Sequence, residues 1–143
     1  MQIDGLDDET IRRVLTTTRR VAVVGASANP DRPSYEITGF LIRRGYSVTP
    51  VNPGLAGQNL LGSPVAANLE EAGPLDMVDI FRASAQVPPV VDEAIRLGAR
   101  TIWMQLGVVH EEAAARARAA GLVVVMDRCP MIEIRRLGIA APA

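Results

Sequence analysis

The chain contains no lysine, and it has only one cysteine and one histidine. All 15 basic residues among its 143 are arginine. A lysine Schiff base and a P-loop lysine are therefore impossible. The single cysteine, Cys129, cannot form an intramolecular disulfide, and His110 has no second histidine with which to hold a metal. We expect neither a disulfide-stabilised protein nor a metal-binding one.

The chain also lacks long apolar runs, and it has no large excess of positive or negative charge. No stretch approaches the ~20 apolar residues of a membrane span. The acidic segment 1–9 lacks the pattern of a signal peptide. The formal net charge is −1 and the charges are scattered, so no basic field favours nucleic acid or an anionic membrane. We expect a cytoplasmic protein that binds neither.

Familiar catalytic patterns are absent as well. There is no C-x-x-C, and Gly25-Ala26-Ser27 lacks the G-x-S-x-G turn that exposes a nucleophilic serine. His110 lies in the predicted first turn of a helix, where we expect it to be solvated, and Asp127 stands without a second carboxylate. The sequence predicts no catalytic residues and favours a binding protein, but it leaves enzymatic activity open.

What the sequence does contain is a regular alternation of apolar and helical segments. Apolar residues make up 48 % of the chain and aromatic residues only 3 %, so we expect a core of Val, Leu, Ile and Ala. Strands are predicted over 21–26, 47–51, 77–81, 100–105 and 122–126. Helices are predicted over 7–17, 34–44, 67–72, 87–97, 110–120 and 130–137. Glycine follows each helix but the first, as is typical of helix C-termini.

This alternation predicts an α/β fold with a doubly wound parallel sheet of about five strands. We expect a single domain over 19–140, with an N-terminal helix in 1–18 packed on it. In such folds ligands bind outside the carboxyl ends of the strands, so the residues that follow each strand are the candidate site.

The first strand ends in Gly25-Ala26-Ser27 and leads to a helix that begins near Pro33. A glycine turn and a helix N-terminus together favour an anion such as a phosphate. Arg32 could reach that phosphate, and Ser34 could bind it or cap the helix. The alternative is a plain turn with Arg32 in solvent. The turn also departs from G-x-G-x-x-G, since Ser27 and Pro30 replace the later glycines.

The second strand ends in Asn52-Pro53. In NAD-binding folds this strand usually ends in an acid that binds the ribose 2′-hydroxyl. No acid stands here, which argues against a nicotinamide cofactor. Asn52 offers a donor and an acceptor, although Asn-Pro can also be a simple turn former.

The remaining strand ends carry further candidates. Phe81 and Arg82 suit adenine packing and phosphate pairing, or are a core aromatic and a surface cation. Gln105 is polar within an apolar run, so we expect it to face the crevice, and Trp103 to lie in the core. Cys129 precedes the last helix, whose dipole could make its thiol reactive; the alternative is an inert apolar role.

Five segments at these strand ends, 23–27, 45–53, 76–82, 103–108 and 121–130, resemble the small stand-alone CoA-binding proteins. Those proteins in turn resemble the CoA-binding domain of the succinyl-CoA synthetase α subunit. The resemblance covers about residues 14 to 138, in order and at fitting intervals. It therefore implies a Rossmann-like domain that binds coenzyme A or an acyl-CoA.

The resemblance also implies roles for individual residues. The turn at Gly25 would hold the pyrophosphate, and Asn52 and Pro53 would line the adenosine side. Phe81 and Arg82 would flank the adenine or its phosphates. The synthetase's phosphohistidine has no counterpart, so we expect no autonomous ligase activity. The candidate cofactor-binding residues are Gly25, Ala26, Ser27, Arg32, Ser34, Asn52, Pro53, Phe81, Arg82, Gln105, Leu106 and Gly107, the last three toward the pantetheine, together with Cys129.

Two other functions remain alternatives. One is an NAD(P)-dependent oxidoreductase, which the missing acid after the second strand disfavours. The other is a CoA-responsive regulatory or interaction module with an unknown protein partner, which would use the same crevice.

Overall fold

The structure is a computed structural model that describes residues 2–140. Its helices are α1 (Asp8–Thr17), α2 (Pro33–Arg43), α3 (Leu69–Ala72), α4 (Val87–Arg96), α5 (Glu111–Ala119) and α6 (Pro130–Leu137). Its main strands are β1 (Arg20–Val24), β2 (Ser47–Val51), β5 (Met77–Ile80), β6 (Thr101–Met104) and β7 (Val123–Val125). These elements match the predicted alternation, with ends shifted by one or two residues.

The five main strands form one parallel sheet in the order β2-β1-β5-β6-β7. From β1 the chain moves outward to β2, returns across β1 to β5, and then continues outward to β6 and β7. The direction of winding therefore reverses between β1 and β5, which makes this the switch point where ligands bind in open α/β sheets.

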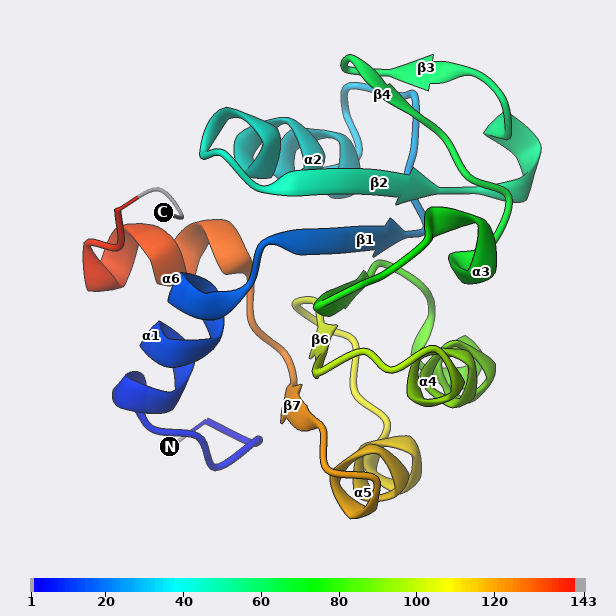
Figure 1. The fold of residues 1–143 in the computed structure, drawn as a ribbon. Coiled ribbons are helices and arrows are strands. Elements are labelled where there is room, and N and C mark those ends of the chain that lie inside the picture. Colours follow the sequence, from blue (N-terminus) through cyan, green and yellow to red (C-terminus); the bar gives the residue numbers. More distant parts are fainter. Residues whose placement is uncertain (1, 141–143) are drawn as a thin grey trace.

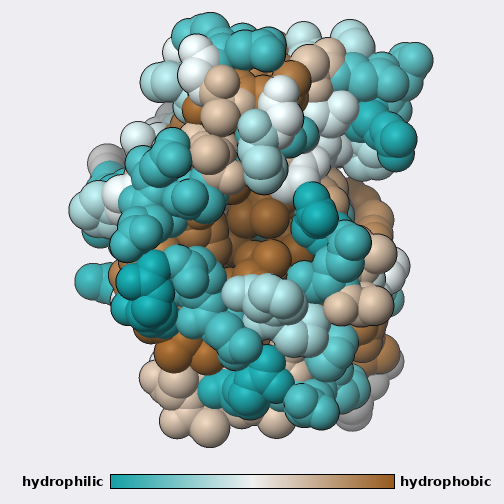
Figure 2. Space-filling view, turned by 90° about the vertical axis from the view of Figure 1, so that its right-hand side faces the viewer, coloured by the Kyte–Doolittle hydropathy of each residue, from teal (hydrophilic) through white to brown (hydrophobic). Residues whose placement is uncertain are grey.

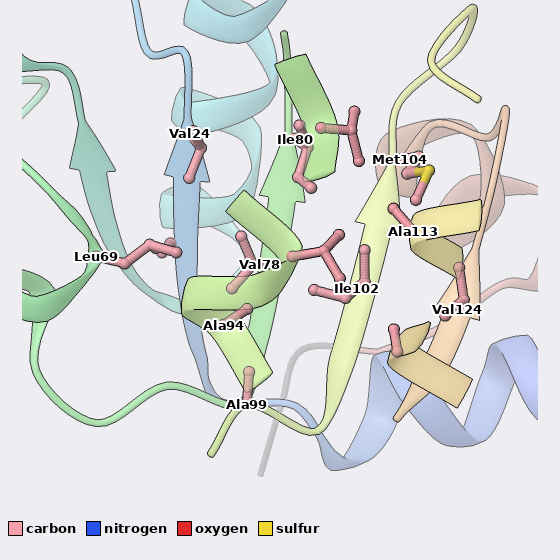
Figure 3. Packing of buried hydrophobic residues seen from close by; sticks show 14 of the residues in the cluster. Val24, Leu69, Val78, Ile80, Ala94, Ala99, Ile102, Met104, Ala113 and Val124 are labelled. Atoms are coloured by element: carbon pink, nitrogen blue, oxygen red, sulfur yellow. The ribbon is translucent and has the colours of Figure 1, made fainter. Parts of the chain in front are cut away.

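Helices cover both faces of the sheet (Figure 1). On one face α3, α4 and α5 pack against Val24, Val78, Ile80 and Ile102, as the close view of this core shows (Figure 3). The other face carries α1, α2 and α6 and buries Trp103 completely. The predicted doubly wound α/β fold and the core position of Trp103 are confirmed.

A buried ion network joins the N-terminal segment to α6. Arg128 is only 3 % exposed and donates to both carboxylate oxygens of Asp4, at 2.8 Å each. It also donates to Glu133 at 2.9 Å and to the carbonyl of Leu6 at 3.0 Å. Burial tends to raise the pKa of Asp4, but hydrogen bonds from Arg128, Leu6 and Met126 outweigh it and hold that pKa below its usual value.

Three details differ from the sequence interpretation. A short hairpin, β3 (Asn59–Leu60) and β4 (Ser63–Pro64), was not predicted, because its strands have two residues each. Ser34 does not cap α2: the cap position is Arg32, without a side-chain bond, and Ser34 lies buried inside the first turn. His110 is the N-cap of α5, where Nδ1 accepts from the N–H of Ala113 at 3.1 Å, rather than a free solvated side chain.

Candidate functional site

A cleft lies over the switch point, at the carboxyl edge of the sheet. Its volume is about 510 Å³, within the usual range for small-molecule sites. It is lined by Gly25, Ala26, Ser27, Arg32, Pro33, Ser34, Asn52, Phe81, Arg82, Gln105, Leu106 and Val108. Figure 2 looks onto this edge of the molecule and shows a hollow with an apolar floor ringed by hydrophilic residues.

The turn after β1 is fixed by the strand beside it. Gly25 has φ +89°, and a Cβ there would lie 2.3 Å from the carbonyl oxygen of Phe81. The N–H groups of Gly25 and Ala26 both donate to the carbonyl of Val51, at 3.2 and 3.3 Å. Glycine is therefore required because β5 packs directly against the turn, a reason that the sequence pattern did not reveal.

Asn52 ties this turn to the end of β2. Its Nδ2 donates to the carbonyl of Ala26 at 2.8 Å, and its Oδ1 accepts from the N–H of Gly54 at 2.8 Å. Both halves of the side-chain amide are thus used within the protein. Asn52 lines the cleft, but its main role is to hold two loops together.

Donors remain available where the turn meets α2. Among the described residues, no acceptor pairs with the backbone N–H groups of Ser27, Ala28 and Ser34. Ser34 lies in the first turn of α2, an 11-residue helix whose dipole favours negative charge there, and Ser27 and Ala28 lie in the loop that joins β1 to this helix. This arrangement suits an anion with several acceptor oxygens.

Two arginines border the same cleft. Arg32 and Arg82 are both exposed, and neither forms an ion pair with any residue in 2–140. Arg82 makes one side-chain bond, from Nε to Oε1 of Gln86 at 3.2 Å. Their positive charges therefore remain available to a ligand.

The end of the cleft beyond β6 combines a buried amide with exposed apolar surface. Gln105 is only 6 % exposed, and its Oε1 has no hydrogen-bond partner among the described residues. Leu106 beside it is 53 % exposed. Gly107 does not line the cleft; its N–H donates to Oδ1 of Asp127 at 2.7 Å, which ties the loop after β6 to the loop after β7.

A second cleft of about 510 Å³ lies on the α3 and α4 side of the switch point. It shares Gly25 and Arg82 with the first cleft and is otherwise more apolar in its lining. The lining residues are Val24, Gly25, Val51, Pro53, Ala67, Asn68, Leu69, Arg82, Ala85, Gln86, Pro89, Val90 and Glu93. Pro53 belongs to this cleft rather than to the one that Asn52 lines.

The model of the CoA binding domain family matches residues 19–135 of this chain. The chain belongs to this family. The resemblance that the strand-end motifs suggested is thereby confirmed. The family relationship covers both clefts and every strand of the parallel sheet.

Two other proteins resemble this chain over most of its length. The chain is 38 % identical to the uncharacterized protein YneT of Bacillus subtilis (strain 168) over 120 residues, which are 83 % of this chain and 87 % of that protein. A hypothetical protein from Pyrococcus horikoshii OT3 superimposes with a TM-score of 0.91 at 36 % identity, covering 96 % of each chain.

The same fold occurs inside larger proteins. An acetyl-coenzyme A synthetase from Ca. Korarchaeum cryptofilum, in its apo form, matches with a TM-score of 0.68 and 23 % identity. The match covers 82 % of this chain but 28 % of the synthetase. At this level of identity the likeness concerns the fold alone.

The structure brings most of the expected residues to the carboxyl edge of the sheet. Two expected residues line neither of the clefts described above: Gly107, which bonds to Asp127, and Cys129, which is 4 % exposed and packs in the core with Trp103. The sequence analysis missed the residues of α3 and α4 that line the second cleft, because nothing in their apolar spacing separates a cleft wall from a core position. It also missed Pro33 and Val108.

Within residues 2–140 no three His, Cys, Asp or Glu side chains come together in a way that could hold a metal ion. Nor does this part of the chain contain a helix of sufficient length and hydropathy to traverse a lipid bilayer.

Proposed function

We propose that this protein binds coenzyme A across the two clefts and has no autonomous ligase activity. The observation that carries the proposal is the convergence, at the switch point, of unpaired backbone donors with two arginines that lack carboxylate partners. Coenzyme A carries most of its charge in its phosphates, and membership of the CoA binding domain family supports this ligand.

The shapes and chemistry of the clefts support an orientation. The pyrophosphate would lie on the turn at Gly25 and the N-terminus of α2, within reach of Arg32 and Arg82. The adenosine would occupy the second cleft, beside Pro53 and the apolar residues of α3 and α4. The pantetheine arm would run through the first cleft past Gln105 and Leu106. Each part of the ligand would thus meet groups of matching polarity.

The residues present fit this ligand on two tests that the structure provides. Gln105 places a nearly buried side-chain amide in the lining of the first cleft, as expected beside a ligand that carries amide groups. Within residues 2–140 the backbone donors at the turn have no acceptor, and Arg32 and Arg82 have no carboxylate partner, as expected beside phosphates. Ligase chemistry is not proposed because His110, the chain's one histidine, uses Nδ1 to cap α5.

Titration calorimetry with coenzyme A, NAD and NADP tests the proposal. We expect coenzyme A to bind with micromolar or tighter affinity and both nicotinamide dinucleotides to bind far more weakly. Adenosine 3′,5′-bisphosphate, which lacks the pantetheine arm, should bind more weakly than coenzyme A because it leaves the Gln105 end of the cleft unfilled. Binding of NAD without any response to coenzyme A would overturn the proposal.

A further inference from the structure

Several buried side-chain polar atoms have no partner in residues 2–140, and one of them, Oε1 of Gln105, belongs to a residue that lines the first cleft. Five buried side-chain polar atoms in residues 2–140 lack a hydrogen-bond partner, and four of them belong to Thr38, Asp79 and Gln105. Thr38 and Asp79 are completely buried, and Gln105 is nearly so. A polar atom that loses water without gaining a partner is destabilising, so this group calls for an explanation.

The three residues share one face of the sheet. Val78 and Ile80 pack against α4 and α5, so the alternation along β5 directs Asp79 to the opposite face, which α2 covers. Asp79 is paired in register with Trp103, which lies on that face. Gln105 follows Trp103 by two residues, so the alternation places it on the same face, and its backbone N–H donates to the carbonyl of Ile80, the residue after Asp79, at 3.3 Å.

The chemistry of the two side chains is complementary. Oε1 of Gln105 can only accept a hydrogen bond. A carboxylate could not help, since it too only accepts. Complete burial, however, raises the pKa of Asp79 well above its ordinary value, and a neutral carboxyl group carries an O–H donor.

We propose that Asp79 is a positioning residue: its carboxyl group donates to Oε1 of Gln105 and so turns the Gln105 amino group toward the cleft. There Nε2 would donate to a carbonyl oxygen of the pantetheine arm. This inference rests on the proposed function for its ligand, but the contact between Asp79 and Gln105 concerns the protein alone.

Two substitutions of Asp79 that fill a similar volume separate the effect of the hydrogen-bond donor from the effect of packing. Asp79→Asn keeps a donor and Asp79→Leu removes it. We expect the Leu variant to bind coenzyme A about three- to tenfold more weakly, the effect of one neutral hydrogen bond, and the Asn variant to bind within about twofold of the parent protein. Affinity for adenosine 3′,5′-bisphosphate should stay unchanged in both, because that ligand does not reach Gln105.

A double-mutant cycle with Gln105→Met checks the route of the effect. Gln105→Met alone should weaken the binding of coenzyme A by about the same factor as Asp79→Leu alone. Adding Asp79→Leu to Gln105→Met should weaken binding no further. An equal loss for the bisphosphate would show a general structural role and overturn the inference. So would an Asn variant that binds as poorly as the Leu variant, or additive effects of the two substitutions.

Spectroscopy of the ligand-free protein keeps this inference separate from the proposed function. Infrared spectra should show the C=O band of a protonated carboxyl group that disappears in Asp79→Asn. The side-chain amide signals of Gln105 in NMR spectra should lie near their parent positions in the Asn variant and move in the Leu variant. If these signatures hold and coenzyme A does not bind, only the proposed function fails. If they are missing, the inference fails whatever binds, and even if the Leu variant does not fold.

Discussion

Arg82 and Arg128 occupy equivalent places in the fold, just beyond the carboxyl ends of β5 and β7, yet their surroundings are opposite. Arg128 is buried and bonds to two carboxylates and a carbonyl group. Arg82 is exposed and bonds to one neutral amide. One arginine thus meets its partners within the chain, and the other still has bonding capacity for a ligand. The number of internal partners, not the residue type, distinguishes the structural cation, Arg128, from the proposed ligand-binding cation, Arg82.

The same contrast extends to whole regions. Around Arg128 the charges form a chain, because Glu133 also accepts from Arg136 at 2.7 Å, and Arg136 donates to Asp8. Around the turn at Gly25, backbone donors and Oε1 of Gln105 have no partner among the described residues. This difference between the two ends supports the proposal that the incomplete end binds the ligand.

The largest effect on stability is expected at Arg128, whose polar contacts are complete within the protein. Arg128→Met would leave the carboxylates of Asp4 and Glu133 buried without their shared cation. We expect the free energy of unfolding, measured in urea, to fall by about 3–5 kcal/mol. Arg116→Met is the matched control, since Arg116 pairs with Asp92 and Glu112 at the surface, where such pairs contribute about 1 kcal/mol or less.

The difference in the free energy of unfolding between the parent protein and Arg128→Met should become smaller at acid pH. The folded protein holds the pKa of Asp4 low, so its stabilising contribution is present above the unfolded-state pKa and is lost as the pH falls through the folded-state value. Parent and Arg128→Met should therefore converge below about pH 4. Equal losses for the Arg128 and Arg116 variants at pH 7 would remove the distinction between buried and surface arginines.

An intermediate effect is expected at the turn of the cleft. Gly25→Ala places a methyl group against the carbonyl of Phe81 in a left-handed backbone conformation. Strain and crowding together should lower the free energy of unfolding by roughly 2–5 kcal/mol. Gly98→Ala, at φ +80° with no atom within 4 Å of the new Cβ, carries the strain alone and should lower it by about 1–2 kcal/mol.

This pair of variants shows whether the backbone of the cleft is as firmly held as the ion network. If Gly25→Ala were no more destabilising than Gly98→Ala, the turn would be able to move away from β5. The cleft would then be a deformable loop rather than a fixed frame.

The smallest effect on stability is expected at Arg82. Arg82→Ala removes a side chain with no charged partner, so the free energy of unfolding should change by less than about 0.5 kcal/mol. The affinity of the Arg82→Ala variant for coenzyme A should nevertheless fall on the order of ten- to hundredfold, because the variant loses a charge-assisted contact with phosphate. Arg118→Ala, an exposed position on α5, should change neither quantity.

If Arg82→Ala lost stability but kept its affinity for coenzyme A, Arg82 would have a structural role rather than the proposed binding role. Calorimetry and urea unfolding on the same samples make the two quantities directly comparable.

Much of the fold followed from the sequence because each β-α unit carries its own signals. The valine run before Gly25 and the glycines after the helices gave the elements and their order. The β3–β4 hairpin escaped because its turn uses Leu61 at φ +53°, where Asn or Gly would have been the recognisable signal. The family motifs then predicted a site at the edge of the sheet where the two clefts lie.

What the sequence could not supply was the partner of each polar group. Asn52 was a candidate ligand contact until its amide proved to be used by Ala26 and Gly54. The ion pair of Arg128 could not be predicted, because its partner Asp4 lies 124 residues away in the chain. The isolation of Asp79 is a property of the packed sheet and α2, which local sequence does not encode.

The double tie made by Asn52 also bears on the kinetics of ligand capture. Because the turn after β1 is held before any ligand arrives, binding does not have to order a loop, and less conformational entropy is lost on association. Ligand-free and ligand-bound forms should have closely similar backbones at this edge, and association should need no slow rearrangement. For the proposed ligand, coenzyme A, association should then be rapid, and the contacts to phosphate and pantetheine should decide the residence time.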